Sequence, residues 1–307
     1  MLRGGAGFTS HPTFQCILEK WLESEKCMEE KWTTVIKAKT GWFDINLKEL
    51  VQYKDLVILF VKRNYAVRYK QTILGPLWLI LNPLITSLLY SLIFGSVAGL
   101  STDGSPQLLF YMSSNAVWAY FASCLSQTST TFTSNAGLFG KVYFPRLAMP
   151  ISVVMTSMLD LLIQIGMLII AMVISVCTGY HLQINSWLIA VPFLILQMAL
   201  LGLGCGIIIS SLTTKYRDLA ILVTFGVQLW MYASPVVYSL AQVPEKYQNL
   251  YLLNPVAPII VIFRHAFLGT GDVPVMMWGV SWITTLIILT IGVILFSRIE
   301  KTFMDTV

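Results

Sequence analysis

Six apolar runs occupy most of the chain after residue 73, and short polar connections separate them. An apolar run of about 20 residues is long enough to cross the hydrocarbon core of a bilayer as a helix. The sequence therefore predicts an all-α polytopic membrane protein with six transmembrane helices in a domain over residues 74–307. The fifth helix is the shortest. The predicted spans cover residues 74–97, 108–131, 148–177, 187–212, 219–232 and 275–296.

A segment with a different pattern precedes the first span. Its apolar and polar positions follow helical spacing over residues 46–61. Asn46, with Glu49 three residues later, resembles a capping box, which opens helices. The segment is too charged to cross a membrane, so we predict a cytoplasmic, interfacial amphipathic helix within residues 42–73. An ordinary soluble helix is the alternative. The apolar side of the predicted helix carries Leu47, Leu50, Val51, Val57, Ile58 and Val61.

The stretch between the fifth and sixth spans, residues 233–271, departs from the pattern. Its two apolar pieces, at 236–240 and 256–268, are each too short to cross a bilayer. Short apolar pieces bounded by proline on one side of a membrane are typical of a re-entrant helical hairpin. We predict such a hairpin before the last span, with a loop outside the membrane as the alternative. The prolines of this stretch are Pro235, Pro244, Pro255 and Pro258.

Composition supports a membrane protein. The 307 residues are 56% hydrophobic and 11% charged, whereas soluble domains are about 25% charged. A soluble enzyme is therefore excluded. The five cysteines show no metal-ligand spacing, so we expect no metal site. Residues 1 to about 27 lack any period, and we interpret residues 1–41 as a disordered N-terminal extension.

Positive charge gathers on one side of the predicted spans. The loops at 101–107 and 178–186 contain no Lys or Arg, whereas the opposite connections carry many. Because basic loops stay in the cytoplasm, this asymmetry predicts that both termini are cytoplasmic. The cations on that side are Lys62, Arg63, Arg68, Lys70, Lys141, Arg146, Lys215, Arg217, Arg298 and Lys301.

The connection between the second and third spans contains N-A-G-L-F-G-K-V-Y-F-P-R at residues 135–146. Gly137 and Gly140 predict breaks in the preceding helix, and Pro145 predicts the end of any helix before it. A cytoplasmic loop needs no cluster of large apolar side chains, so we expect a partner's groove to receive it. Contact with lipid headgroups is the alternative. The apolar members are Leu138, Phe139, Val142, Tyr143 and Phe144.

Within the spans, Asp160 and Gln164 lie one helical turn apart. An ionisable group near the bilayer centre is costly and faces protein or water. We favour a hydrogen bond to a neighbouring span over a proton relay, because the other spans carry no acid. Gly202 and Gly206 form a G-x-x-x-G packing surface. The chain contains no G-x-x-x-x-G-K-[ST] motif, so we expect no ATP hydrolysis by this subunit alone.

The junction V-K-R-N-Y-A-V-R-Y-K-Q-T-I-L-G-P-L-W-L-I-L-N-P at residues 61–83 resembles that of polysaccharide-exporting ABC transporter permeases, the class that exports O-antigen, capsule and teichoic acid. The similarity covers about residues 42–305. It includes G-L-F-G-K-V-Y-F-P-R, the S-S-L-T-T-K-Y-R-D sequence after the fourth span, and the hairpin at Asn254 and Pro255.

The resemblance implies a multi-pass homodimer in the cytoplasmic (inner) membrane of a bacterium, paired with two copies of a separate ABC ATPase that binds ATP and Mg. The subunit itself would bind no cofactor and no nucleic acid. Its substrate would be an undecaprenyl-pyrophosphate-linked glycan. The segment at 137–146 would be the coupling helix, and 233–271 the external gate. The implied coupling residues are Leu138, Phe139, Lys141, Tyr143, Phe144 and Arg146.

Two groups of side chains are candidates for contact with that substrate. A pyrophosphate cannot enter hydrocarbon without cations, and Arg63, Arg68 and Lys70 lie at headgroup depth. Arg68 is the favoured ligand, because a guanidinium pairs with phosphate bidentately. Contact with anionic lipid is the alternative. Aromatic rings that could line a glycan channel, or merely pack, are Trp78, Tyr90, Trp118, Tyr120, Phe225, Trp230 and Tyr232.

Other functions remain as alternatives to polysaccharide export. The chain could be the permease of an ABC exporter for another amphipathic lipid or drug. A proton-coupled secondary transporter would need more intramembrane charge than Asp160. A membrane glycosyltransferase would need clustered cytoplasmic carboxylates, and the loops carry almost no acid beyond Asp218.

Overall fold

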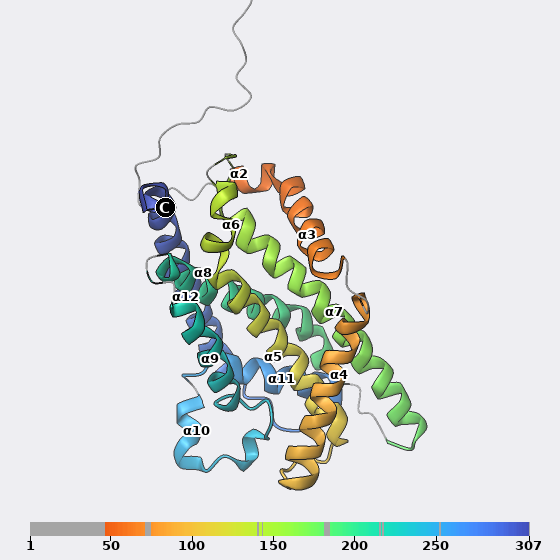
Figure 1. The fold of residues 1–307 in the computed structure, drawn as a ribbon. Coiled ribbons are helices and arrows are strands. Elements are labelled where there is room, and N and C mark those ends of the chain that lie inside the picture. Colours follow the sequence, from red (N-terminus) through yellow and green to blue (C-terminus); the bar gives the residue numbers. More distant parts are fainter. Residues whose placement is uncertain are drawn as a thin grey trace, which may run out of the picture. The chain divides into compact units, whose positions relative to one another are not determined.

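The computed structural model describes residues 47–70, 75–139, 141–142, 144–180, 185–214, 216, 218–251 and 253–306. The extension predicted at 1–41 and the capping residue Asn46 lie outside this part of the chain. The described residues form helices joined by turns, with no strand among them. The predicted all-α polytopic membrane fold is therefore confirmed (Figure 1).

Five helical segments of the described chain are long and apolar enough to cross a membrane. The first combines the 3-10 turn η1 (Gly75–Leu77), α4 (Trp78–Tyr90) and the π-helical η2 (Ser91–Val97). The fourth combines η3 (Ser186–Ala190) with α8 (Val191–Thr213). The others are α5 (Gln107–Ser129), α7 (Ala148–Cys177) and α12 (Val275–Thr306). The remaining predicted span, the fifth along the chain, corresponds to α9 (Leu219–Tyr232), which has only 14 residues.

Helix α5 lies at the centre of the membrane domain, packed against α4, α7, α8, α9 and α11. Most of its residues are buried, as expected for a helix without a strongly polar side. The predicted packing surface of α8 is confirmed, because it meets α5 here. A Cβ atom on Gly202 would lie 2.7 Å from Cys124 Cβ, and one on Gly206 would lie 2.5 Å from Thr128 Cβ. Only glycine lets the two backbones approach this closely.

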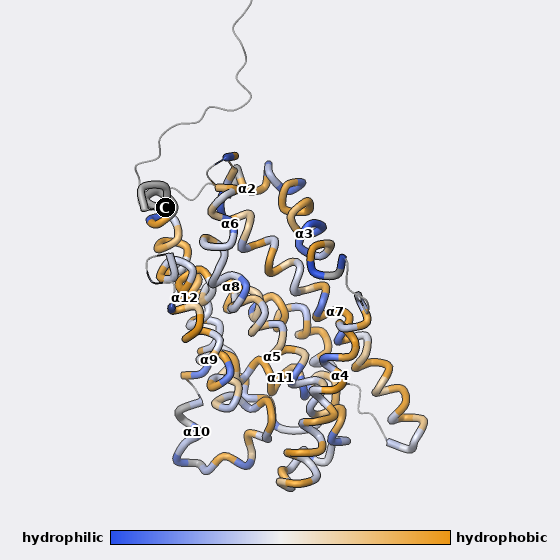
Figure 2. Tube along the Cα trace, in the orientation of Figure 1, coloured by the Kyte–Doolittle hydropathy of each residue, from blue (hydrophilic) through white to orange (hydrophobic). Residues whose placement is uncertain are grey.

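The predicted interfacial helix extends further than its sequence pattern suggested. It forms α2 (Leu47–Gln52) and α3 (Lys54–Tyr69), so the basic stretch is itself helical. Helix α3 packs against α7 (Figure 1) through the face that carries Phe60. Figure 2 shows that the end of α3 nearest α4 is strongly hydrophilic.

The apolar face assigned to this helix was partly wrong. Val51 and Ile58 are exposed, whereas Phe60 is buried and Asn64 and Arg68 are partly buried. The last three are spaced by four residues and therefore share one face of α3. Packing against α7 selects this face because the polar members find partners on other helices: Asn64 Nδ2 lies 3.5 Å from Ser152 Oγ on α7.

Only half of the predicted hairpin is an apolar helix. Residues 256–268 form the buried helix α11 (Val256–Leu268), which ends at Gly269 with φ of 71°. Residues 236–240 were expected to form the other helix but instead form turns that lead into η4 (Leu240–Gln242). The short helix α10 (Glu245–Tyr251) follows. The polar groups of these turns need partners that a helix would have supplied internally.

Asn254 supplies partners for the turn at Ala233 and Ser234, which leads into residues 236–240. Its Nδ2 donates to the carbonyl of Ala233 at 3.1 Å and lies 2.9 Å from Ser234 Oγ. Its Oδ1 accepts from Trp230 Nε1 and from the backbone N–H of Val256, both at 3.1 Å. One side chain thus joins the end of α9 to the start of α11.

Candidate functional site

A cavity of about 490 Å³ opens among α3, α4, α5 and α7. It is unusual for its setting, because most of the residues that line it have polar side chains although three of these four helices are apolar segments long enough to cross a membrane. Polar side chains that line a space within a membrane domain mark a path or site for a polar ligand. The lining residues are Arg68, Trp78, Leu79, Asn82, Pro83, Thr86, Asn115, Ala119, Tyr120, Ser123, Ser157, Asp160 and Gln164.

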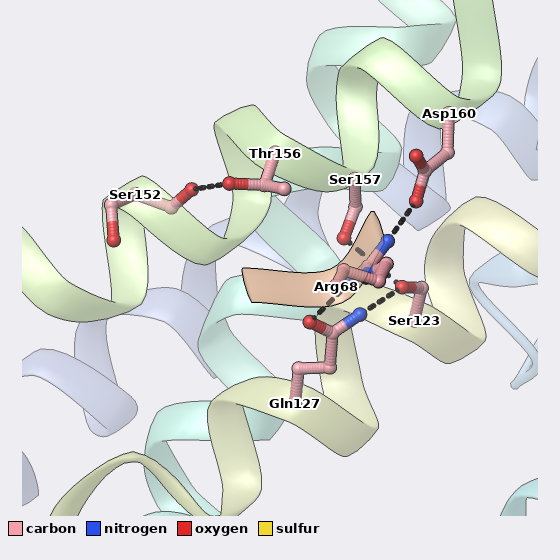
Figure 3. Close-up of polar contacts among 7 residues, drawn as sticks. All are labelled: Arg68, Ser123, Gln127, Ser152, Thr156, Ser157 and Asp160. Carbon is pink, nitrogen blue, oxygen red and sulfur yellow. Dashed lines mark hydrogen bonds and ion pairs between the residues drawn. The ribbon is translucent and has the colours of Figure 1, made fainter. Parts of the chain in front are cut away.

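The guanidinium of Arg68 organises one wall of the cavity (Figure 3). Its Nη1 lies 2.5 Å from Asp160 Oδ2 on α7, and its Nη2 donates to Gln127 Oε1 on α5 at 2.8 Å. The Nε2 of Gln127 donates in turn to Ser123 Oγ at 2.5 Å, which lies 3.0 Å from Ser157 Oγ. This chain of bonds ties α3 to α5 and α7.

The ion pair makes the charged lining of the cavity neutral in sum. The side chains of Arg68 and Asp160 are 30% and 16% exposed, so the pair is largely removed from water. At such a site a charge without its partner would be costly, and the hydrogen bond to Gln127 helps to satisfy the guanidinium. Asp160 therefore has a structural partner, as favoured over the proton relay, but that partner comes from α3 and not from a neighbouring span.

A signal for this contact was present in the sequence. Asp160 is the only acid in the six apolar runs. An intramembrane carboxylate pairs with a cation or lies against water, and Arg68 continues the face of α3 that begins with Phe60 and Asn64. What the sequence did not contain was the crossing of α3 over α7, which brings the two side chains together.

The three residues predicted to bind a pyrophosphate do not lie together in the cavity. Among them, Arg68 lines it, and its guanidinium is engaged by protein side chains. Arg63 is exposed, donates to Asn64 Oδ1 and Asn135 Oδ1, and lies over the ring of Phe60 at 5.0 Å. Lys70 is exposed just beyond the end of α3.

The predicted channel aromatics are also divided between different surroundings. Trp78 and Tyr120 line the cavity, and Trp78 is 44% exposed. Trp118 is buried, and its ring centroid lies 5.5 Å from that of Phe121. The ring centroid of Trp230 lies 5.1 Å from that of the same phenylalanine. Trp118 therefore has a packing role and does not line this cavity.

The remaining aromatics lie towards α9. Tyr90 packs on Phe94 with ring centroids 5.8 Å apart, and its hydroxyl donates to Met231 Sδ at 3.3 Å. Phe225 and Tyr232 are exposed on α9 itself. None of these three residues lines the cavity to which Trp78 contributes.

The segment at 137–146, predicted to be a coupling helix with exposed apolar side chains, differs from this prediction in both respects. Helix α6 (Thr131–Phe139) continues through Gly137, and residues 141, 142 and 144–147 lie in turns and irregular backbone. Phe139 and Phe144 are each only 5% exposed and so cannot be the exposed anchors that were predicted. They pack in one aromatic cluster, which we call the phenylalanine cluster: Phe60, Phe132, Phe139, Phe144 and Phe296.

The exposed part of this segment is smaller than the sequence suggested. Val142 is 55% exposed, and Lys141 beside it is also exposed. Leu138 is partly buried against the phenylalanine cluster, and the guanidinium of Arg146 lies 5.7 Å from the ring of Phe139. Tyr143 lies outside the described residues. The surface left for a partner therefore centres on Lys141 and Val142.

Comparisons with known proteins bear on this arrangement. The ABC-2 type transporter family matches residues 55–268. The chain is 29% identical over 252 residues to the O-antigen export system permease protein RfbA of Klebsiella pneumoniae, covering 82% of this chain and 94% of that protein. It is 28% identical over 225 residues to the RfbA of Myxococcus xanthus, with 72% and 83% covered. It is 23% identical over 257 residues to the polysialic acid transport protein KpsM of Escherichia coli, with 83% and 97% covered.

Proposed function

The chain belongs to the ABC-2 type transporter family, and on that premise we propose that it is the transmembrane subunit of an ATP-driven exporter of cell-surface polysaccharide. Relatives that align over most of their length are named as export or transport proteins for O-antigen and polysialic acid. The observation that carries the proposal is the polar cavity of about 490 Å³ within an apolar helix bundle, because a glycan needs polar contacts where lipid offers none.

The energy would come from a separate ABC ATPase that binds ATP and Mg, two copies of it serving a homodimer of this chain. The proposed contact with the ATPase is the exposed surface at Lys141 and Val142, just after the end of α6. The phenylalanine cluster lies beneath this surface and joins α6 to α3 and α12. A push from the ATPase would therefore reach α3, and through Arg68 the wall of the cavity.

The substrate would be a glycan linked to undecaprenyl pyrophosphate. Lys62, Arg63 and Lys70 are exposed on or beside α3 and would face the diphosphate at headgroup depth. Arg68 fits this role less well than the sequence suggested, because Asp160 already neutralises it. We therefore assign the diphosphate to the exposed cations and not to the guanidinium in the cavity.

The proposed site of action is the cytoplasmic membrane of a bacterium, with both termini in the cytoplasm. The two connections without Lys or Arg, around residues 98–106 and after α7, lie at the end of the bundle opposite to α2 and α6 (Figure 1). This segregation supports the orientation that the positive-inside rule predicts.

Export by the reconstituted complex tests the proposal. The full-length chain, co-expressed with the ATPase from its own organism, should restore surface polysaccharide to a host that lacks its exporter. A complex whose ATPase carries a disabled Walker A lysine is the matched control and should restore none. ATP turnover stimulated equally by lipids with and without a glycan would overturn the proposal in favour of another amphipathic substrate.

A further inference from the structure

We propose that the external end of this subunit opens along one seam, where residues 91–106 meet the rest of the bundle, and that α11 stays in place when it opens. The moving segment consists of η2 and the connection that leads into α5. The inference rests on the proposed function for the need of an exit. It goes beyond that function because it assigns the opening to the first span and not to residues 233–271.

The position of η2 relative to the cavity is the first argument. Helix α4 lines the cavity within residues 78–86, and η2 continues the same spanning segment towards the external end. There η2 packs against the start of α5. A Cβ atom on Gly95 would lie 2.7 Å from Gln107 Cδ, and Ser96 Oγ donates to Gln107 Oε1 at 3.3 Å. The segment therefore covers the external side of the cavity along the interface of α4 and α5.

Residues 91–106 also form a unit of their own. The backbone hydrogen bonds of its turns stay within it, as where the N–H of Leu100 donates to the carbonyl of Phe94 at 2.9 Å. Its outer side buries little, since Val97 is 80% exposed. The η2 segment is π-helical, a conformation that is rare in proteins and frequent at functional sites. Movement of this unit would leave its internal hydrogen bonds intact.

Two side-chain hydrogen bonds join this unit to the connections around α11, and we call this pair of contacts the seam. Ser239 Oγ donates to Asp103 Oδ2 at 2.6 Å. The hydroxyl oxygens of Ser105 and Thr270 lie 2.6 Å apart. A hydrogen bond at an accessible end of a protein contributes little net stability, because water replaces it when it breaks. The seam can therefore open and close again at low cost.

The start of α11, in contrast, is held by a buried network. The carbonyl of Pro255 accepts from Ser281 Oγ on α12 at 2.6 Å, and Ser281 Oγ accepts from Gln197 Nε2 on α8 at 2.7 Å. Gln197 Oε1 accepts in turn from Trp278 Nε1 at 2.8 Å. Gln197 and Ser281 are almost completely buried. Away from water, the polar groups of a broken network would lose partners that nothing replaces, so this end of α11 stays fixed.

The second half of α11 is anchored by a buried charge. Arg264 is only 2% exposed, and its guanidinium lies 4.1 Å from the ring centroid of Phe110 on α5. Its Nη1 donates to the carbonyl of Pro235 at 3.2 Å and to Ser114 Oγ on α5 at 3.4 Å. Separation of α11 from α5 would leave this cation in apolar surroundings without its ring and its acceptors. Helix α11 therefore moves only together with α5.

The experiment measures access to the cavity from outside the cell. Thr86→Cys places a thiol in the cavity lining of α4, in a full-length variant without the five native cysteines, expressed with its ATPase in intact cells. A membrane-impermeant maleimide should label it about three- to tenfold faster when Ser239→Ala removes one bond of the seam. Thr178→Ala removes an exposed hydroxyl from another external connection and should leave the rate unchanged.

A disulfide tests the seam in the opposite direction. Ser105→Cys with Thr270→Cys replaces two hydroxyl groups whose oxygens lie 2.6 Å apart, so the two sulfur atoms come within bonding reach. Oxidation should lower the labelling rate of Thr86→Cys at least about tenfold, and a reductant should restore it. Ile260→Cys, which is buried in α11, should stay unlabelled whether the seam is free or cross-linked.

Three results would overturn the proposal: equal labelling of Thr86→Cys with the seam free and cross-linked, an unchanged rate in Ser239→Ala, or labelling of Ile260→Cys as fast as that of Thr86→Cys. The last result would assign the movement to α11 instead. None of these readouts requires that polysaccharide reach the cell surface. If labelling follows the seam and the complex restores no surface polysaccharide, the proposed function fails while the opening stands.

Discussion

The guanidinium of Arg68 is the point at which α3, α5 and α7 meet, and its surroundings determine what it can do. Its partners lie 59 and 92 residues further along the chain. An arginine that joins three helices in this way stabilises their arrangement, and its charge is neutralised by a carboxylate of the same protein. The same residue on an isolated surface helix would have been a natural ligand for phosphate.

A double-mutant cycle measures this contact. Arg68→Met keeps the apolar stem, and Asp160→Leu removes the carboxylate; each should lower the free energy of unfolding, because it leaves the other charge without its partner. The two together should cost less than the sum, with a coupling energy of about 1–2 kcal/mol, since the pair is not fully buried. Unfolding in mixed micelles provides the measurement.

The matched control for this cycle pairs Arg63→Met with Asp160→Leu. Arg63 lies on the same helix but contacts Phe60, Asn64 and Asn135, so its effect should be additive with that of Asp160. Additive effects for Arg68 as well would contradict the structural role of the pair.

At the scale of elements, the phenylalanine cluster explains why Phe139 and Phe144 look exposed in the sequence and are buried in the structure. Aromatic side chains in a short loop can bind a partner or fill a gap between helices of their own chain, and a single sequence does not distinguish these outcomes. Here Phe132 and Phe296 stack with centroids 4.6 Å apart, and Phe139 and Phe144 pack beside them. The cluster therefore belongs to the fold.

Two substitutions in this loop should separate stability from coupling. Phe144→Ala should lower the free energy of unfolding by about 3–5 kcal/mol, because it leaves a cavity in the cluster. Val142→Asp changes an exposed side chain and should leave stability within about 0.5 kcal/mol. It should nevertheless weaken co-purification with the ATPase, because it puts a charge on the proposed contact.

Phe144→Ala is therefore expected to lower stability, whereas Val142→Asp is expected to weaken ATPase binding at unchanged stability. Chemical unfolding gives the stability, and ATP turnover of the purified complex gives the coupling. If Val142→Asp retains full complex formation and turnover, the ATPase contact does not lie at this surface.

The elements differ in how far the sequence determined them. The long apolar runs predicted α5, α7, α8 and α12 because burial in lipid requires a helix whatever its neighbours are. The face of α3 could not be predicted in this way, since α7 decides which side of α3 is buried. Residues 236–240 were likewise not predictable, since the turn at Ala233 and Ser234 that leads into them is held by Asn254, from outside that segment. The cavity depends on such contacts between distant segments, so only its individual polar residues could be named in advance.

At the scale of the whole membrane domain, hydrophilic segments lie at the two ends and mostly hydrophobic helices lie between them (Figure 2). The hydrophilic part of α3 lies towards one end, and α10 with its neighbouring turns lies at the opposite end. The buried helix α11 is part of the core and packs against α5, α8 and α12.

The orientation of this arrangement in the membrane can be tested by single cysteines in a variant without the five native ones, since Cys177 is exposed. Lys246→Cys on α10 should react with a membrane-impermeant maleimide added to intact cells, because α10 lies at the end predicted to be outside. Lys141→Cys should react only after the membrane is permeabilised. Phe263→Cys, which is buried in α11, should stay protected in both conditions. Labelling of Lys141→Cys in intact cells would reverse the orientation and remove its surface from the reach of a cytoplasmic ATPase.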